Sequence, residues 1–217
     1  MRKLIILLLS SMFVFAQASA VGLKVGVAGV TGVFHATGEE NENGEVHTED
    51  ATGVVGYGAV FAEVNINDMF GIGIDYVPDT LSSETAETAL DDLQASGDGA
   101  SSQQTNTVAL EFEDLTQIYA TLNLGEHLYV KAGILTVDVI TNESLGTGST
   151  YDNTDMEGDV FGIGYDRELD NGLFFRIEGQ YMELEDKSLT ASNNSENTVS
   201  LKAFEGASAR IAVGKAF

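Results

Sequence analysis

The chain has 217 residues, and its 34 acidic against 10 basic side chains give a formal net charge of −24 at pH 7, which argues against nucleic acid as a partner. Cysteine is absent, so disulfides contribute nothing and stability must come from the fold. Hydrophobic residues make up 43% of the chain, with 24 glycines and one proline. This composition excludes a disordered polar chain and favours strands.

The first part of the chain has the pattern of a secretory signal. Two basic residues precede an apolar stretch at residues 4–16, and the sequence then reaches the small residues Ala18 and Ala20. The stretch is shorter than the roughly 20 apolar residues of a transmembrane helix, which disfavours a helical anchor. We expect residues 1–20 to be a signal peptide cleaved after Ala20, and residues 21–217 to form one domain.

Most of the remaining chain alternates apolar and polar residues over lengths typical of transmembrane strands, about 9–11 residues. In one clear case Phe70, Ile72 and Ile74 alternate with glycine and aspartate. The predicted strands cover residues 21–34, 53–66, 70–77, 107–124, 128–139, 161–166, 173–181 and 207–217.

The connections between these strands alternate strictly between short and long. Short turns fall at residues 65–69, 123–127 and 170–172, and the Asn171-Gly172 pair in the last of these is a strong hairpin signal. Long connections cover residues 35–51, 78–106, 140–159 and 185–198. This alternation is expected of a barrel with short periplasmic turns and long external loops, and an even strand count places both termini on the periplasmic side. We therefore predict an all-β fold, an eight-stranded antiparallel transmembrane β-barrel.

The long connections carry much of the surplus negative charge. Residues 35–51 alone contain six acidic side chains. In the second long connection Ala86, Leu90 and Leu93 recur at near-helical spacing, so we expect a short helix around residues 83–95.

Metal and catalytic chemistry have only weak signals in these connections. The oxygen-rich run at residues 152–159 could bind Ca²⁺, but it lacks the loop glycine and closing glutamate of an EF-hand, which favours a solvated acidic loop. His35, His47 and His127 fall in or beside connections, and no motif joins them to a serine and an acid. We predict no catalytic residue, no cofactor and no metal site.

Alternation alone does not say which face lines the interior. A soluble lipocalin-like barrel would turn its apolar face inward. The opposite arrangement is favoured because the polar face is also the glycine face and carries charges of both signs. The predicted network of charges in the lumen comprises Lys24, Glu63, Asp75, Glu111, Glu113, Lys131, Arg176, Glu178 and Arg210.

Three readings of that network compete. Eight strands leave an interior just wide enough for side chains, and buried charges there must pair, so a salt-bridged plug is favoured. A narrow conduit for water or small ions is the second reading. The third is a catalytic site, for which Glu111 and Glu113 on one strand face could form a carboxylate pair.

Two segments carry a resemblance to a known family. Residues 162–184, GIGYDRELDNGLFFRIEGQYMEL, contain a Gly-x-Gly-Tyr strand, an Asn-Gly turn and an Arg-x-Glu strand. The last predicted strand alternates apolar residues and closes on Phe217. The chain resembles the small eight-stranded outer-membrane barrels, namely the OmpA-like barrel domain, OmpX and Ail. Lys215 departs from this pattern, because the family usually has an apolar or aromatic residue there.

The resemblance implies an outer-membrane location, with Phe217 read by the barrel-assembly machinery. It also implies a monomer in contact with lipid and lipopolysaccharide, and a non-catalytic structural or surface-interaction role such as adhesion, envelope integrity or phage reception. The acidic external loops would then meet a surface ligand or phage. A narrow passive pore is the alternative function, and a lipid-modifying enzyme is a third.

Overall fold

The computed structural model of the protein describes residues 22–42, 45–83, 86–93, 101–145 and 148–217. The predicted signal peptide, with Ala18 and Ala20, lies outside the described residues. The strands are β1 (Gly22–Glu42), β2 (Glu45–Asn65), β3 (Phe70–Tyr76), β4 (Leu81–Ser82), β5 (Ala86–Leu93), β6 (Ser101–Asn123), β7 (Leu128–Ser144), β8 (Thr154–Glu168), β9 (Leu173–Leu184), β10 (Lys187–Thr190) and β11 (Thr198–Ala216). Within the described residues, no helix is long and apolar enough to cross a membrane.

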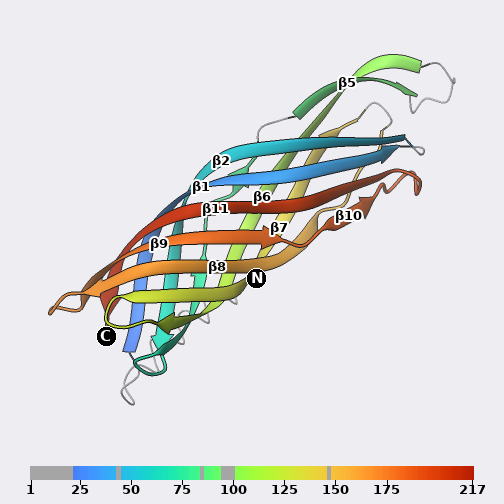
Figure 1. Ribbon diagram of the computed structural model, residues 1–217. Helices are drawn as coiled ribbons and strands as arrows, with labels where there is room; N and C mark the ends of the chain where they lie inside the picture. The colour runs from blue at the N-terminus through green and yellow to red at the C-terminus, as the bar shows by residue number, and fades with distance from the viewer. Residues whose placement is uncertain (1–21, 43–44, 84–85, 94–100, 146–147) are drawn as a thin grey trace.

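The main strands close into an antiparallel ring in the order β1, β2, β3, β6, β7, β8, β9 and β11, and β11 pairs back onto β1 (Figure 1). The prediction of an eight-stranded antiparallel barrel is therefore confirmed. The short turns and the C-terminus lie at one end of the ring, which we call the short-turn end. At the other, long-hairpin end, β4 and β5 pair with β6, and β10 pairs with β11.

An apolar belt covers the outside of the ring. Its side chains include Val27, Ile72, Ile118, Ile134, Phe161, Ile163, Phe175, Ile177, Ile211 and Val213, all among the exposed hydrophobic residues. Over the length of this belt the strands bury charged residues inside, among them Lys131, Arg176 and Arg210, which is the reverse of a lipocalin-like barrel and the arrangement of a transmembrane one.

Towards the long-hairpin end the belt stops at a row of carboxylates. Asp159 on β8 lies opposite Glu183 on β9, and Glu183 lies opposite Glu205 on β11. The Tyr181 hydroxyl, on the belt side of this row, donates a hydrogen bond to Glu205. Side chains directly opposite on one sheet face are close neighbours, so this row marks where the wall leaves the apolar environment.

A bulge in β6 exchanges the two faces of that strand. The register shifts between Glu113 and Thr116, and Asp114 has a positive φ of 53°. On the short-turn side Gln117 is buried in the lumen, whereas beyond the bulge Phe112 packs inside. Glu111 and Glu113 consequently lie outside the lumen network predicted for them. The Glu113 carboxylate instead accepts a hydrogen bond of 2.9 Å from the Thr80 hydroxyl.

The predicted helix around residues 83–95 is wrong. Strand β5 (Ala86–Leu93) occupies most of this stretch and pairs with β6 over the segment that begins at Ser101. Near-helical spacing of three apolar residues is a weak signal, and the available edge of β6 outweighs it. The connection predicted at residues 35–51 is also mostly strand. Here β1 and β2 continue beyond the predicted strand ends and stay paired out to Glu42 and Glu45.

Candidate functional site

A charge network fills the lumen at the short-turn end. Its cations are Lys24, Lys131, Arg176 and Arg210, and its anions are Glu63, Asp75, Asp166 and Glu178. We call these eight residues the lumen network. Their side chains are 1–4% exposed, apart from Lys24 and Asp166 at 13%. Four positive and four negative formal charges cancel, as buried charges require.

Arg176 is the centre of one half of the network. Its Nη1 and Nη2 donate to the two carboxylate oxygens of Glu63 at 2.8 Å and 3.0 Å. Its Nη2 lies 2.8 Å from Asp166 Oδ2, and Lys24 Nζ donates to the other oxygen of Asp166 at 2.9 Å. The guanidinium also lies 4.7 Å from the ring centroid of Tyr129. Bidentate, ring-stacked arginine is held in one geometry, so this half is rigid.

Lys131 is the centre of the other half. Its Nζ donates to Gln117 Oε1 at 3.0 Å and to Glu178 Oε1 at 3.4 Å, and it lies 4.2 Å from the ring centroid of Tyr119. The Tyr129 hydroxyl donates to Glu178. Arg210 Nη1 donates to Asp75. Lys131 Nζ also lies 4.0 Å from Asp75 Oδ2, so the five strands that carry these groups, β3, β6, β7, β9 and β11, are tied together through the lumen.

The structure brings together seven of the nine residues that the sequence proposed for the network, all except Glu111 and Glu113. Sequence reasoning missed Asp166, which lies directly opposite Arg176 on the neighbouring strand. A register for the Asn171-Gly172 hairpin would have placed that acid beside the arginine.

The network predicted from the sequence also leaves out the tyrosines of the lumen. Tyr119 and Tyr129 lie over Gly73 and Gly164, where any side chain atom would meet the rings. Gly73 and Gly164 thus make room for tyrosine rings whose hydroxyls donate hydrogen bonds to Glu63 and to Glu178.

Beyond the network the lumen becomes apolar. Val137, Met156, Val160, Met182 and Leu184 form a buried cluster against which Phe34, Phe112 and Phe204 pack. Gln117 Nε2 lies 3.4 Å from the Met182 sulfur, where the two regions meet. The lumen therefore has a polar half at the short-turn end and an apolar half beyond it.

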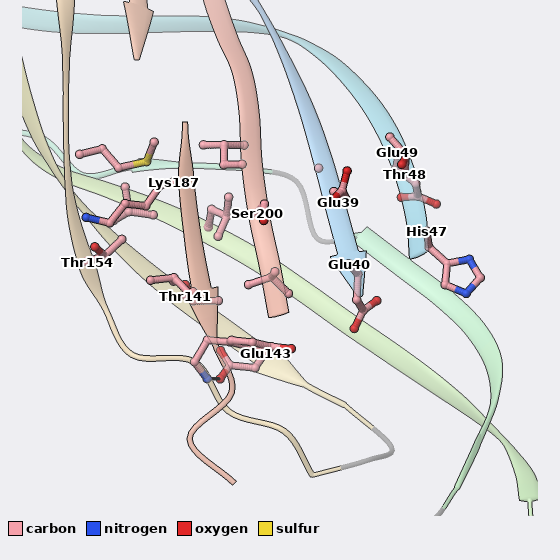
Figure 2. Close-up of a pocket in the computed structure, with 18 of the residues that line it drawn as sticks. Glu39, Glu40, His47, Thr48, Glu49, Thr141, Glu143, Thr154, Lys187 and Ser200 are labelled. Atoms are coloured by element: carbon pink, nitrogen blue, oxygen red, sulfur yellow. Dashed lines mark hydrogen bonds between the residues drawn. The ribbon is translucent and has the colours of Figure 1, made fainter. Parts of the chain in front are cut away.

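A pocket of about 380 Å³ lies over this apolar half at the long-hairpin end (Figure 2). We call it the mouth pocket. Its floor includes Leu110, Val139, Tyr151, Met156, Val199 and Leu201. Its rim carries Glu39, Glu40, His47, Glu49, Glu143 and Lys187. Figure 2 shows Glu39, Glu40 and Glu49 on one side of the pocket and Lys187 with Thr154 on the other.

A second pocket of about 380 Å³ lies at the short-turn end. It is lined by polar side chains that include Lys24, Asn65, Asn123, His127, Asp166 and Arg176. The lumen network forms its inner wall and separates it from the mouth pocket.

The histidines have separate surroundings. His127 packs against Tyr165 with 5.2 Å between ring centroids, and His35 Nδ1 lies 3.2 Å from the Thr52 hydroxyl. His47 is on the rim of the mouth pocket. Within the part of the chain that the structure describes, no group of three histidine, cysteine or carboxylate side chains could hold a metal ion.

One carboxylate outside the apolar belt has a perturbed pKa. Asp138 on β7 lies opposite Asp155 on β8, farther along the wall than the carboxylate row. Partial burial, together with the charges of Asp114 and Asp155, raises the pKa of Asp138 above its ordinary value.

The last strand ends against the first. The Phe217 amide donates to the Leu23 carbonyl at 2.9 Å, and the Phe217 side chain is 65% exposed at the short-turn end of the belt. This is where an aromatic residue meets the edge of a membrane.

The fold and its lumen can be compared with known proteins. OprG from Pseudomonas aeruginosa aligns with a TM-score of 0.60 at 11% identity, covering 91% of this chain and 95% of that one. This protein has the fold of the outer-membrane β-barrels. The Ail protein of Yersinia pestis, solved with the heparin analogue sucrose octasulfate, aligns with a TM-score of 0.37 at 10% identity, covering 88% and 99%. The OmpT protease of Escherichia coli aligns with a TM-score of 0.41 at 7% identity, covering 91% and 96%.

No protein-family model and no curated protein sequence matches the chain. At identities this low the barrel architecture is what is shared.

Proposed function

We propose that this barrel is a non-catalytic integral outer-membrane protein that acts at the cell surface through its long-hairpin end. The observation that carries the proposal is the neutral lumen network, which closes the membrane-embedded half with paired, buried charges. With lipid on the outside of that half and packed charges inside it, we place binding at the cell surface in the long-hairpin end, where the mouth pocket lies.

A narrow passive pore is the second candidate, and the two pockets are the observation that favours it. A solute would have to cross from one pocket to the other through Arg176, Glu63 and their partners. Such a path would require these buried ion pairs to separate, and removing one partner of a buried pair typically costs about 3–5 kcal/mol. The network therefore disfavours a permanently open pore. Planar-bilayer recordings of the refolded protein should show no discrete conductance steps. Regular conductance steps would make the passive pore the favoured function.

A catalytic function has less support from this geometry. The carboxylate pair considered for it, Glu111 and Glu113, faces away from the lumen because of the bulge at Asp114. Lipid product analysis with the refolded barrel would test the alternative of a lipid-modifying enzyme, and we expect unchanged lipid.

The orientation proposed here places both termini in the periplasm and the long hairpins outside the cell. The signal peptide would direct export, Phe217 would be read by the assembly machinery, and the apolar belt would contact lipid and lipopolysaccharide as a monomer. An epitope inserted after Asn194 should be reached by antibody on intact cells. The same epitope between Asn171 and Gly172 should be reached only after the outer membrane is permeabilised. The reverse pattern would overturn the orientation.

A further inference from the structure

The mouth pocket combines an apolar floor with an acidic rim. Val139, Tyr151 and Met156 on the floor are 4%, 7% and 3% exposed, and Val139 and Met156 belong to the apolar cluster that fills the lumen below. A pocket of about 380 Å³ is within the usual range for small-molecule sites, which are mostly apolar with a few polar groups that fix orientation.

The charge at the rim has one sign. Four glutamates line the pocket against one lysine. Lys187 donates its Nζ hydrogen to the backbone carbonyl of Asp155 at 3.0 Å. Outside the lining, Lys202 forms a 2.7 Å ion pair with Glu39, so the rim and its neighbours keep a negative excess.

The acids also surround the floor rather than gather on one loop. Glu39 and Glu40 come from β1, Glu49 from β2 and Glu143 from β7, on a different part of the ring. Glu143 is fixed by the Tyr151 amide, which donates to its carboxylate at 2.8 Å. A ligand with its apolar part on the floor would have its polar end among carboxylates.

We propose that the mouth pocket binds small cationic amphiphiles, with the alkyl tail on the apolar floor and the ammonium head at the glutamates. The complementarity of charge selects this occupant over anionic amphiphiles of the same tail length. The inference rests on the proposed function only in that the pocket must face the outside of the cell.

The test uses octyltrimethylammonium as the probe, with octyl sulfate as the anionic counterpart of equal tail length. Each is titrated by calorimetry into the full-length refolded barrel in phosphatidylcholine nanodiscs, with empty nanodiscs subtracted to remove partitioning into lipid. We expect saturable binding of the cation, about tenfold or more tighter than the anion, and weaker binding at high salt. Equal affinities, or no heat beyond empty nanodiscs, would overturn the proposal.

Variants separate the two parts of the site. Glu143→Gln on the rim should weaken the cation several-fold and leave the anion unchanged or slightly tighter, whereas Leu189→Asn on the pocket wall should weaken both. Glu168→Gln, exposed near the short-turn end, removes the same charge far from the pocket and should change neither. A cation affinity that Glu143→Gln and Glu168→Gln alter equally would contradict a site at the mouth.

Whole cells distinguish this inference from the proposed orientation. Cells that display the barrel should take up a fluorescent alkylammonium at their surface, and the Glu143→Gln cells should take up less. Binding in nanodiscs combined with none on intact cells would contradict the outward orientation and leave the pocket assignment standing. Loss of binding in both would overturn the pocket assignment itself.

Discussion

Arg176 on β9 binds Glu63 on β2 through two parallel hydrogen bonds of 2.8 Å and 3.0 Å, although 113 positions separate them in the sequence. The two strands are not neighbours in the ring, so the pair ties opposite parts of the wall across the lumen. Such a contact constrains the closed ring more than any pair between adjacent strands.

The first prediction concerns this contact. Arg176→Ala should lower the free energy of unfolding by about 3–5 kcal/mol, because it leaves Glu63 and Asp166 buried without their shared cation. Urea unfolding of the refolded protein in lipid vesicles measures the change. Arg167→Ala, on the exposed face near the same hairpin, is the control and should be nearly neutral. A variant that gains conductance with little loss of stability would make Arg176 a gate instead of a plug.

The second prediction tests the apolar belt. Ile72 is 50% exposed on the outside of β3, so Ile72→Arg should cost about 2–4 kcal/mol if this position lies near the middle of the membrane. Asp152→Arg adds the same side chain on an exposed connection and should cost little. The measurement is again urea unfolding in vesicles. A wild-type chain that stays folded and monomeric with no lipid or detergent would contradict the membrane assignment.

The barrel itself could be predicted from the sequence because membrane strands repeat one physical requirement. Alternation exposes Ile211 and Val213 while Arg210 is buried, and the Asn171-Gly172 turn sets a hairpin register. Each strand is weak evidence, but the strict order of short and long connections adds the information that single strands lack.

The site could be predicted only in its polar half. The bulge at Asp114 exchanges the faces of β6, and the sequence marks it only by a short break in the alternation, with Asp114 at an apolar position and Leu115 at a polar one. The apolar half of the lumen was not predicted either. Leu135 and Val137 share the inward face with Lys131, and a strand with apolar residues on both faces shows no alternation from which the inward face could be assigned.

The third prediction concerns that bulge. Asp114 has a φ of 53°, a conformation that aspartate and asparagine tolerate and β-branched residues do not. Asp114→Val should therefore cost about 1–2 kcal/mol of unfolding free energy, beyond the loss of the hydrogen bond from the Tyr76 hydroxyl. Asp114→Asn, which tolerates this backbone, is the control. Equal stability of the two variants in vesicle unfolding would show that the bulge carries no backbone constraint.

The fourth prediction is a pH dependence. The pKa of Asp138 is raised in the folded protein, so the folded state holds this proton more tightly than the unfolded chain does. Ionisation of Asp138 therefore costs stability above the folded pKa, and acidification through that pKa removes the cost.

Asp138→Asn should accordingly stabilise the barrel at neutral pH. Its advantage should shrink as the pH falls through the folded pKa and vanish below the ordinary value of 3.8. Unfolding in vesicles over a pH series measures this, with Asp170→Asn in the exposed short turn as the control. If the unfolding free energy of Asp138→Asn ran parallel to that of the control at every pH, the burial of Asp138 and the charges of Asp114 and Asp155 would not raise its pKa in the folded protein.

The last prediction separates the folding of the barrel from its proposed work at the surface. Replacing residues 38–48 and 83–99 with short Gly-Ser turns removes the outer part of the β1–β2 hairpin and all of β5, together with Glu39, Glu40 and His47 from the mouth pocket. The lumen network and the apolar belt keep every residue, so the chain should still migrate as a heat-modifiable, folded barrel when unboiled and boiled samples are compared on a gel. Whole-cell binding of surface ligands or phage should be lost, because the removed hairpins carry the acidic surface. If folding were lost, the hairpins would be structural. A folded barrel with an unchanged surface phenotype would move the function into the barrel body and bring the passive pore to first place.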